Sequence, residues 1–250
     1  MATPLAAERP WALSVSLEAD LQTRVADVQA RIARAAVRIG RLPESVRLVA
    51  VSKTYPVEHV RAAFAAGQTD FGENRVQEAL QKVGATADLP IRWHLIGHLQ
   101  SNKAKKAAQV FHLIHSIDRL DLLDAVDRAA VEAGTSPGLL LQVDLAGEPT
   151  KHGAALDALQ PLVEAALGCR AARLRGLMLL PPFLDDPEEV RPYFQRLRDL
   201  RDELVGRGVA PAALAELSMG MSHDFEVAVE EGATIVRVGT AIFGARGSAA

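Results

Sequence analysis

The chain has 250 residues, of which 49% are hydrophobic and 24% are charged, and its formal net charge is -3. This balance is typical of a folded globular protein, excludes a disordered or membrane-embedded chain, and gives no reason to expect nucleic acid or anionic lipid as a partner. The length suits one α/β barrel domain. We therefore expect residues 1–250 to form a single domain, with flexible tails at 1–15 and 247–250.

The cysteine content and the apolar runs predict a cytoplasmic protein. Cys169 is the only cysteine, so no internal disulfide can form, and a reducing compartment fits best. Glu8 and Arg9 interrupt the N-terminal apolar residues before a signal-peptide core could form, and no later run is long enough to span a bilayer. We expect a protein that is neither exported nor inserted into a membrane.

The first predicted element is a long amphipathic helix, and short strands follow it. From Leu17 onward apolar residues recur at helical spacing, and Gly40 is placed to end the helix. Eight short apolar runs come next. We expect them to be strands, and in chain order they read "VRLVAVSK", "TDFGEN", "IRWHLIG", "HLIHSID", "GLLLQVDL", "LRGLMLLP", "LAELSMG" and "ATIVRVG".

Helical patterns separate these runs and decide the fold class. Examples lie at residues 57–66, 119–133, 154–167, 188–205 and 223–231. Strands that alternate with helices of this length predict right-handed crossovers and a parallel sheet, and eight such units are what a closed barrel requires. The sequence therefore predicts an α/β fold of the (β/α)8 TIM-barrel type with an additional long N-terminal helix.

Polar residues gather where the predicted strands end, which is where a barrel of this type carries its site. The first strand ends in Lys53, and Val49, Val51 and Lys53 share one of its faces. If that face points inward, the lysine amine is partly desolvated and can form a Schiff base with a carbonyl. The alternative is a lysine at the barrel rim that reaches solvent.

The last two strands each lead into a glycine flanked by hydroxyl residues. Gly220 lies in "SMGMS" and Gly239 in "VGT", with Ser218, Ser222 and Thr240 beside them. Glycines at these positions let backbone N–H groups approach a ligand, and the loops after strands seven and eight are the usual phosphate site of this fold. Alternatively, the glycines only make tight turns and the hydroxyls cap helices.

Arg237 lies inside an apolar strand, where a buried charge needs a partner, and the candidates are a carboxylate such as Glu73 or a ligand. An imine-forming lysine, a phosphate site and an inward arginine together indicate a phosphorylated aldehyde, with pyridoxal 5'-phosphate the leading candidate. We interpret His98 as a wall of this site and Met219 as a packing or cofactor contact. His94 and His98 are four residues apart in a strand and turn, so we expect no metal site.

The chain resembles the pyridoxal phosphate homeostasis proteins, relatives of the alanine racemase barrel. The resemblance runs from the first helix to Arg246. It rests on "AVSKT", "FGENRVQEA", "WHLIGHLQSNK", "HSIDR", "KHG", "LRGLM", "LSMGMS" and "VRVGTAIFGAR". It implies that Lys53 carries the cofactor as an internal aldimine, that Asn74 lies beside its ring, and that Arg237 faces the pyridine nitrogen. It also implies a phosphate site formed by Ser218, Ser222, Gly239 and Thr240.

The resemblance implies a binding and homeostasis protein for pyridoxal phosphate rather than an enzyme. Racemases of this type need a second base, which comes from a C-terminal domain, and we expect no such domain because the sequence stops after the eighth strand. The alternatives are an amino-acid racemase-like enzyme that uses the same cofactor and, less favoured, a Schiff-base aldolase acting on a sugar phosphate. Apo forms of enzymes that use the cofactor are candidate recipients, and we expect a monomer.

Overall fold

The computed structural model describes residues 10–147 and 152–244, and within them eight parallel strands close into a barrel. Each strand pairs with the next along the chain, and β8 returns to pair with β1. The predicted fold class is therefore confirmed. The strands are β1 Arg47–Val51, β2 Asp70–Glu73, β3 Arg92–Leu95, β4 Leu113–Ile117, β5 Gly138–Val143, β6 Arg173–Leu179, β7 Glu216–Ser218 and β8 Ile235–Val238.

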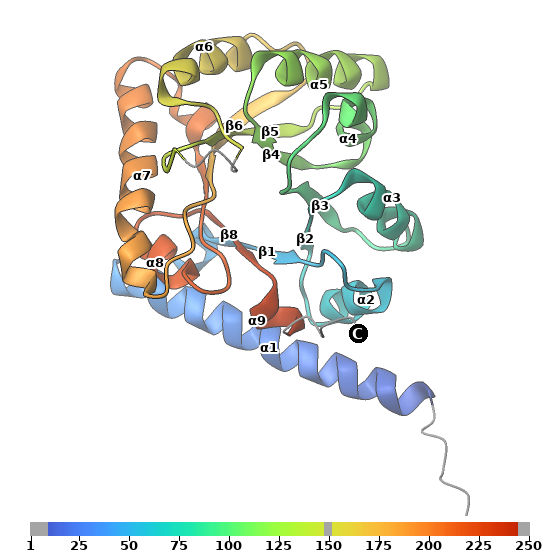
Figure 1. Cartoon of the computed structure of the whole chain (residues 1–250). Helices are drawn as coiled ribbons and strands as arrows, with labels where there is room; N and C mark the ends of the chain where they lie inside the picture. The colour runs from blue at the N-terminus through green and yellow to red at the C-terminus, as the bar shows by residue number, and fades with distance from the viewer. Residues whose placement is uncertain (1–9, 148–151, 245–250) are drawn as a thin grey trace, which may run out of the picture.

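Helices surround the barrel, and the predicted N-terminal helix is the longest of those described (Figure 1). None of the described helices is both long enough and apolar enough to cross a membrane. The helices are α1 Pro10–Arg38, α2 Val57–Ala65, α3 Val76–Ala85, α4 Ala104–Val110, α5 Leu120–Ala133, α6 Leu156–Leu167, α7 Arg191–Gly206, α8 Phe225–Glu230 and α9 Thr240–Phe243. Short 3-10 turns are η1 Pro43–Ser45, η2 Ser101–Lys103, η3 Pro187–Val190 and η4 Pro211–Leu214.

Several predicted boundaries move by a few residues for local reasons. Strand β1 ends at Val51, so Lys53 lies in the turn that follows rather than in the strand. Helix α6 begins at Leu156 because Ala154 is paired with Val143 in a β-bridge. Helix α1 already begins at Pro10, inside the predicted tail, whereas the predicted tail at 247–250 lies outside the described residues.

The alternation of side chains along the strands divides the buried residues into two layers. One apolar cluster, formed by Val49, Leu113, Leu140, Met178 and Ile235, lies in the interior of the barrel. The opposite faces of the same strands pack against the helices, and Leu48 and Ala50 of β1 belong to that larger outer cluster. A residue's position in the strand therefore decides whether it meets the barrel interior or the helical layer.

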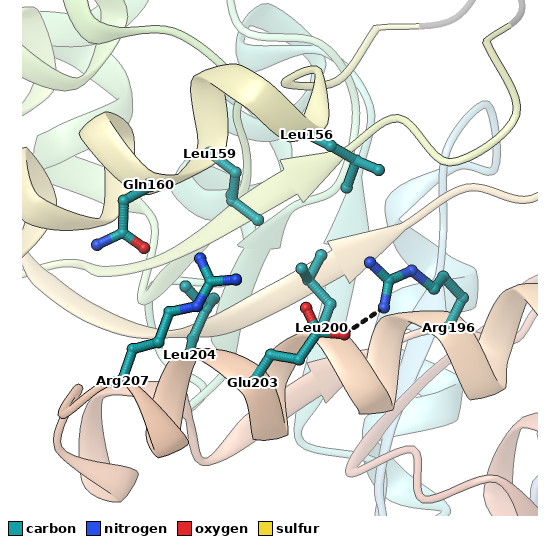
Figure 2. Close-up of a pocket in the computed structure, with 8 residues that line it drawn as sticks. All are labelled: Leu156, Leu159, Gln160, Arg196, Leu200, Glu203, Leu204 and Arg207. Carbon is teal, nitrogen blue, oxygen red and sulfur yellow. Dashed lines mark hydrogen bonds and ion pairs between the residues drawn. The ribbon is translucent and has the colours of Figure 1, made fainter.

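The helical layer contains a narrow hollow between α6 and α7, with a volume of about 180 Å³ (Figure 2). Leucines from both helices line it, and an ion pair of 2.6 Å between Arg196 and Glu203 lies along α7 at its edge. Because its lining comes from two helices and from no strand end, this hollow is a seam in the packing of the outer layer.

Helix α1 covers one side of the barrel and packs against α2, α8 and α9 (Figure 1). Its inner face buries a row of apolar side chains at helical spacing, including Leu21, Val25 and Val28, each no more than 1% exposed. Val37 lies on the outer face and is 64% exposed. The row explains why a helix that precedes the first strand is part of the folded core.

This packing predicts unequal costs for two substitutions on the same helix. Leu21→Ala should lower the free energy of unfolding by about 2–5 kcal/mol, because it leaves a cavity in a buried interface. Val37→Ala, the control, should change it by less than about 0.5 kcal/mol. Urea denaturation of both variants measures the difference, and equal effects would show that α1 does not pack as described.

Candidate functional site

A pocket of about 530 Å³ opens at the C-terminal ends of the barrel strands. Its volume lies in the range of small-ligand sites, and it occupies the position where barrels of this type carry their sites. The pocket is lined by Val51, Lys53, Tyr55, Asn74, Ile96, Gly97, His98, Leu180, Phe183, Met221, Ser222, His223, Asp224, Arg237, Gly239 and Thr240. Most of the residues singled out in the sequence are thus brought together, whereas Ser218, Met219 and Gly220 are not among its lining.

Lys53 reaches the pocket from a turn with an unusual backbone conformation. The turn follows β1, whose Val49 faces the barrel interior, and Val51 and Lys53 both line the pocket. Thr54, the next residue, has a φ of +69° and is the one residue other than glycine with a positive φ in the described chain. A branched side chain in this region costs conformational energy, so neighbouring contacts have to hold the turn in place.

A buried lysine on α3 supplies those contacts. The Nζ of Lys82 donates to the carbonyl oxygen of Ser52 at 2.7 Å, to Glu73 Oε1 at 2.7 Å and to Glu78 Oε1 at 3.0 Å. The backbone N–H of Thr54 donates to the same Glu78 oxygen, and the Ser52 hydroxyl donates to Glu73 Oε1 at 2.6 Å. Both residues that flank Lys53 are therefore tied to one ammonium group and its two carboxylates.

Glu73 is consequently not the partner of Arg237. Strand alternation turns Glu73 outward to the helical layer, where it pairs with Lys82, while Arg237 faces the barrel interior. Burial raises the pKa of Glu73, although hydrogen bonds from Lys82 and Ser52 oppose the shift. Glu73, the carboxylate that the sequence suggested as a partner of Arg237, is excluded because the barrel wall separates the two groups.

Arg237 lies at the inner end of the pocket and is only 3% exposed. Its Nη1 donates to the Ser218 hydroxyl at 2.6 Å and its Nη2 donates to the carbonyl oxygen of Leu179 at 2.8 Å. Burial lowers the pKa of Arg237 to about 10, which still leaves it a cation at neutral pH. Ser218 therefore contacts the arginine rather than lining the pocket itself.

The loops after β7 and β8 are joined to one another next to the pocket. The Ser222 hydroxyl accepts hydrogen bonds from the backbone N–H of Gly239 at 3.0 Å and of Ala241 at 3.4 Å. Gly220 has a φ of +89°, and a Cβ there would lie 2.5 Å from that of Ala228, so this position needs glycine for packing. Met219 is fully buried in the outer cluster.

The opposite wall of the pocket comes from the ends of β2 and β3. A Cβ on Gly97 would lie 2.4 Å from the carbonyl oxygen of Asn74, so the glycine allows these two loops to touch. His98 stacks on His152, with ring centroids 3.7 Å apart and planes inclined by 14°. Burial, followed by the nearby His152, lowers the pKa of His98. His98 thus lines this wall of the pocket.

These two histidines and Asp118 bring three metal-ligating groups together, with their ligand atoms all within 4.8 Å of one another. The nearly parallel rings place their nitrogen lone pairs side by side instead of directing them toward a common point, which a tetrahedral metal site requires. Arg119 already binds Asp118 at 3.0 Å. We therefore assign no metal to this cluster.

The sequence did not assign several of the lining residues to the site. Tyr55, Phe183, His223 and Asp224 all lie in loops that follow strand ends, and this position was the available signal. Tyr55 donates from its hydroxyl to the carbonyl oxygen of Gly244 at 2.6 Å, and Phe183 is 73% exposed beside the His223 ring. Burial raises the pKa of Asp224.

The fold and this site place the chain in a known class of barrel proteins. Residues 25–247 match the family model described as alanine racemase, N-terminal domain. The chain is 47% identical over 207 residues to the pyridoxal phosphate homeostasis protein of Aquifex aeolicus, covering 83% of this chain and 90% of that one. It is 46% identical over 216 residues to the protein of the same name from Pseudomonas aeruginosa, covering 83% and 87%. The chain belongs to the pyridoxal phosphate homeostasis protein family.

Solved structures agree with this assignment. PipY of Synechococcus elongatus PCC7942, in the structure with PLP bound, is 42% identical with a TM-score of 0.80, and the match covers 90% of this chain and all of that one. Alanine racemase from Streptomyces coelicolor is 20% identical with a TM-score of 0.68, covering 93% of this chain and 59% of the racemase. The second likeness concerns the fold alone.

The contacts of Lys82 predict a large cost when its charge is removed. Lys82→Ala should lower the free energy of unfolding by about 3–5 kcal/mol at neutral pH, because Glu73 is left as a buried charge without its ammonium partner. Chemical denaturation measures this loss. Lys105→Ala removes an exposed lysine that pairs with Glu132 at 3.8 Å, and it should cost less than about 1 kcal/mol.

The loss in Lys82→Ala should also depend on pH. A carboxyl whose folded-state pKa is raised destabilises the fold above that pKa, and protonation relieves the effect as the pH falls through it. The deficit relative to wild type should therefore shrink on moderate acidification. A deficit that stays constant would mean that the unpaired Glu73 charge is not its cause.

Proposed function

We propose that the protein binds pyridoxal 5'-phosphate (PLP) in this pocket through a Schiff base on Lys53 and acts in intracellular PLP homeostasis. The observation that carries the proposal is the convergence of an amine, a guanidinium and hydroxyl groups on one pocket, contributed by Lys53, Arg237, Ser222 and Thr240. These are the groups that an aldehyde, an aromatic ring nitrogen and a phosphate would meet. The PLP-bound structure of PipY and the names of the curated relatives support the choice of ligand.

The donor set of the pocket fits this ligand. The Lys53 amine would condense with the aldehyde carbon, so that a C=N bond replaces the C=O bond and the oxygen leaves as water. Ser222, Gly239 and Thr240 would bind the phosphate, with Ser218 and Gly220 behind them, and Asn74 and His98 would lie beside the ring. The chemistry that PLP supplies when bound is that of an aldehyde and an electron sink.

The position of Arg237 favours storage or transfer of the ligand over turnover. An arginine donates hydrogen bonds and does not transfer its proton at neutral pH, so a pyridine nitrogen facing it stays unprotonated. An unprotonated ring withdraws electrons less strongly and stabilises carbanions poorly. We therefore infer a binding role, with apo forms of PLP enzymes as recipients and the protein acting as a cytoplasmic monomer.

Absorbance spectroscopy with added PLP tests the covalent linkage. Wild type should develop the absorption band of a Schiff base, and borohydride reduction followed by peptide mapping should find the label on Lys53. Lys53→Ala should lose the band and the label while keeping weak binding through the phosphate contacts. Lys106→Ala, which removes an exposed lysine of α4, should behave as wild type. A label that persists in Lys53→Ala would reject the assignment.

Incubation with amino acids tests the absence of turnover. Protein loaded with PLP should neither racemise L-alanine nor exchange its α-hydrogen in deuterated water at a rate above that of free PLP. An alanine racemase run in parallel is the positive control. Exchange that disappears in Lys53→Ala would instead identify a PLP-dependent enzyme that acts on amino acids.

A further inference from the structure

Five polar side chains form a continuous chain of hydrogen bonds across the interior of the barrel. Asp70 Oδ1 lies 3.0 Å from His94 Nε2, and His94 Nδ1 lies 2.9 Å from His115 Nε2. His115 Nδ1 lies 2.8 Å from the hydroxyl of Ser218, which Arg237 contacts at 2.6 Å. All five are buried, and they come from β2, β3, β4, β7 and β8 in turn. This series of hydrogen bonds connects Asp70, at the start of β2, to Arg237 in the pocket.

Neutral histidine rings, together with the chemistry of the two ends, fix the direction of every hydrogen bond in the series. Asp70 as a carboxylate only accepts, so His94 carries its proton on Nε2, and a neutral His94 then accepts on Nδ1 from His115 Nε2. A neutral His115 accepts on Nδ1 from the Ser218 hydroxyl, whose oxygen accepts from the guanidinium of Arg237. The two neutral histidines therefore share one tautomer.

The environment of each member agrees with this assignment. Burial lowers the pKa of His94, and it lowers that of His115 well below its ordinary value, so both rings stay neutral. Although burial opposes it, hydrogen bonds from His94 and Arg92 hold the pKa of Asp70 well below its usual range. Arg92 is half exposed and binds the Asp70 carboxylate at the N-terminal end of the barrel strands. Asp70 is thus an anion at one end of the chain, and Arg237 is a cation at the other.

Arg237 needs a negative group to compensate its buried charge. No carboxylate of residues 10–147 or 152–244 forms an ion pair with it, and Asp224 acts on it only from a distance. An isolated buried charge is costly, whereas aligned hydrogen bonds polarise one another and lower that cost. The aligned dipoles place their negative ends toward the guanidinium at every step from Asp70 to Ser218.

We propose that Asp70, His94, His115 and Ser218 are positioning residues that hold Arg237 as an oriented cation at the inner end of the pocket. The ligand atom that meets Arg237 must then be a hydrogen-bond acceptor. That this atom belongs to PLP rests on the proposed function, but the hydrogen-bond chain itself does not.

The first experiment examines the protein without any ligand. Long-range nitrogen–proton NMR correlation at neutral pH reads the tautomer of each histidine ring, with His94→Gln and His115→Gln used for assignment. Neutral rings with the proton on Nε2 are expected for both. A proton on Nδ1, or a charged ring, in either residue would overturn the proposal whether or not the protein binds PLP.

The second experiment measures PLP binding by absorbance in substituted proteins. Asp70→Asn keeps an acceptor for His94 but removes the charge, and it should weaken binding by roughly tenfold, which is about 1.4 kcal/mol. Asp88→Asn, a matched control at an exposed carboxylate that pairs with Arg61, should have no effect. Ser218→Ala should weaken binding similarly, and Ser218→Thr should restore it because the hydroxyl is kept.

Some variants will unfold at the same denaturant concentration as wild type. In those variants a purely structural role would leave the absorption band of bound PLP and its pH profile unchanged. A shifted profile in Asp70→Asn with normal stability supports the proposal, and an unchanged affinity and profile would reject it. The two hypotheses fail separately. If Lys53 is not labelled but the histidine tautomers are as expected, the proposed function falls and the positioning of Arg237 stands.

Discussion

The closure of β8 onto β1 is the constraint on which the rest of the structure depends. Their parallel pairing sets Val49 opposite Arg237, so that one register places both side chains in the barrel interior. The same alternation, carried around the barrel by the remaining strand pairs, decides that Asp70, His94, His115 and Ser218 face inward. A shift by one residue would expose these polar groups to the helical layer and remove their partners.

Two buried polar systems serve the pocket from opposite sides of the barrel wall. Outside the wall, Lys82 and its carboxylates hold the turn that carries Lys53. Inside the wall, the hydrogen-bond chain from Asp70 ends on Arg237. Of these residues, only Lys53 and Arg237 line the pocket. Buried charges are expensive in the interior of a protein, so their concentration behind Lys53 and Arg237 argues for a site whose geometry is set before a ligand arrives.

The family relationship and the geometry have separate parts in the functional conclusion. Matches that cover most of this chain and of its relatives establish the family, whereas the likeness to an alanine racemase at 20% identity concerns the barrel. What the barrel does is decided at the strand ends, because one fold hosts many chemistries. At these strand ends the buried guanidinium of Arg237 donates hydrogen bonds and remains a cation at neutral pH, which is the feature on which the proposed binding role depends.

The sequence by itself determined the alternation of strands and helices, the order of the eight strands and part of the pocket lining. These features depend on local periodicity and on residues next to strand ends, which a linear pattern records. The sequence left open whether Lys53 faces inward or reaches solvent at the barrel rim, and it proposed His98 as a wall of the site. The tertiary structure alone decided which charges meet. Nothing in the sequence indicated that His94 pairs with His115, and Lys82 carried no signal, because their partners lie on other strands and helices and pairing across a barrel leaves no trace in sequence spacing.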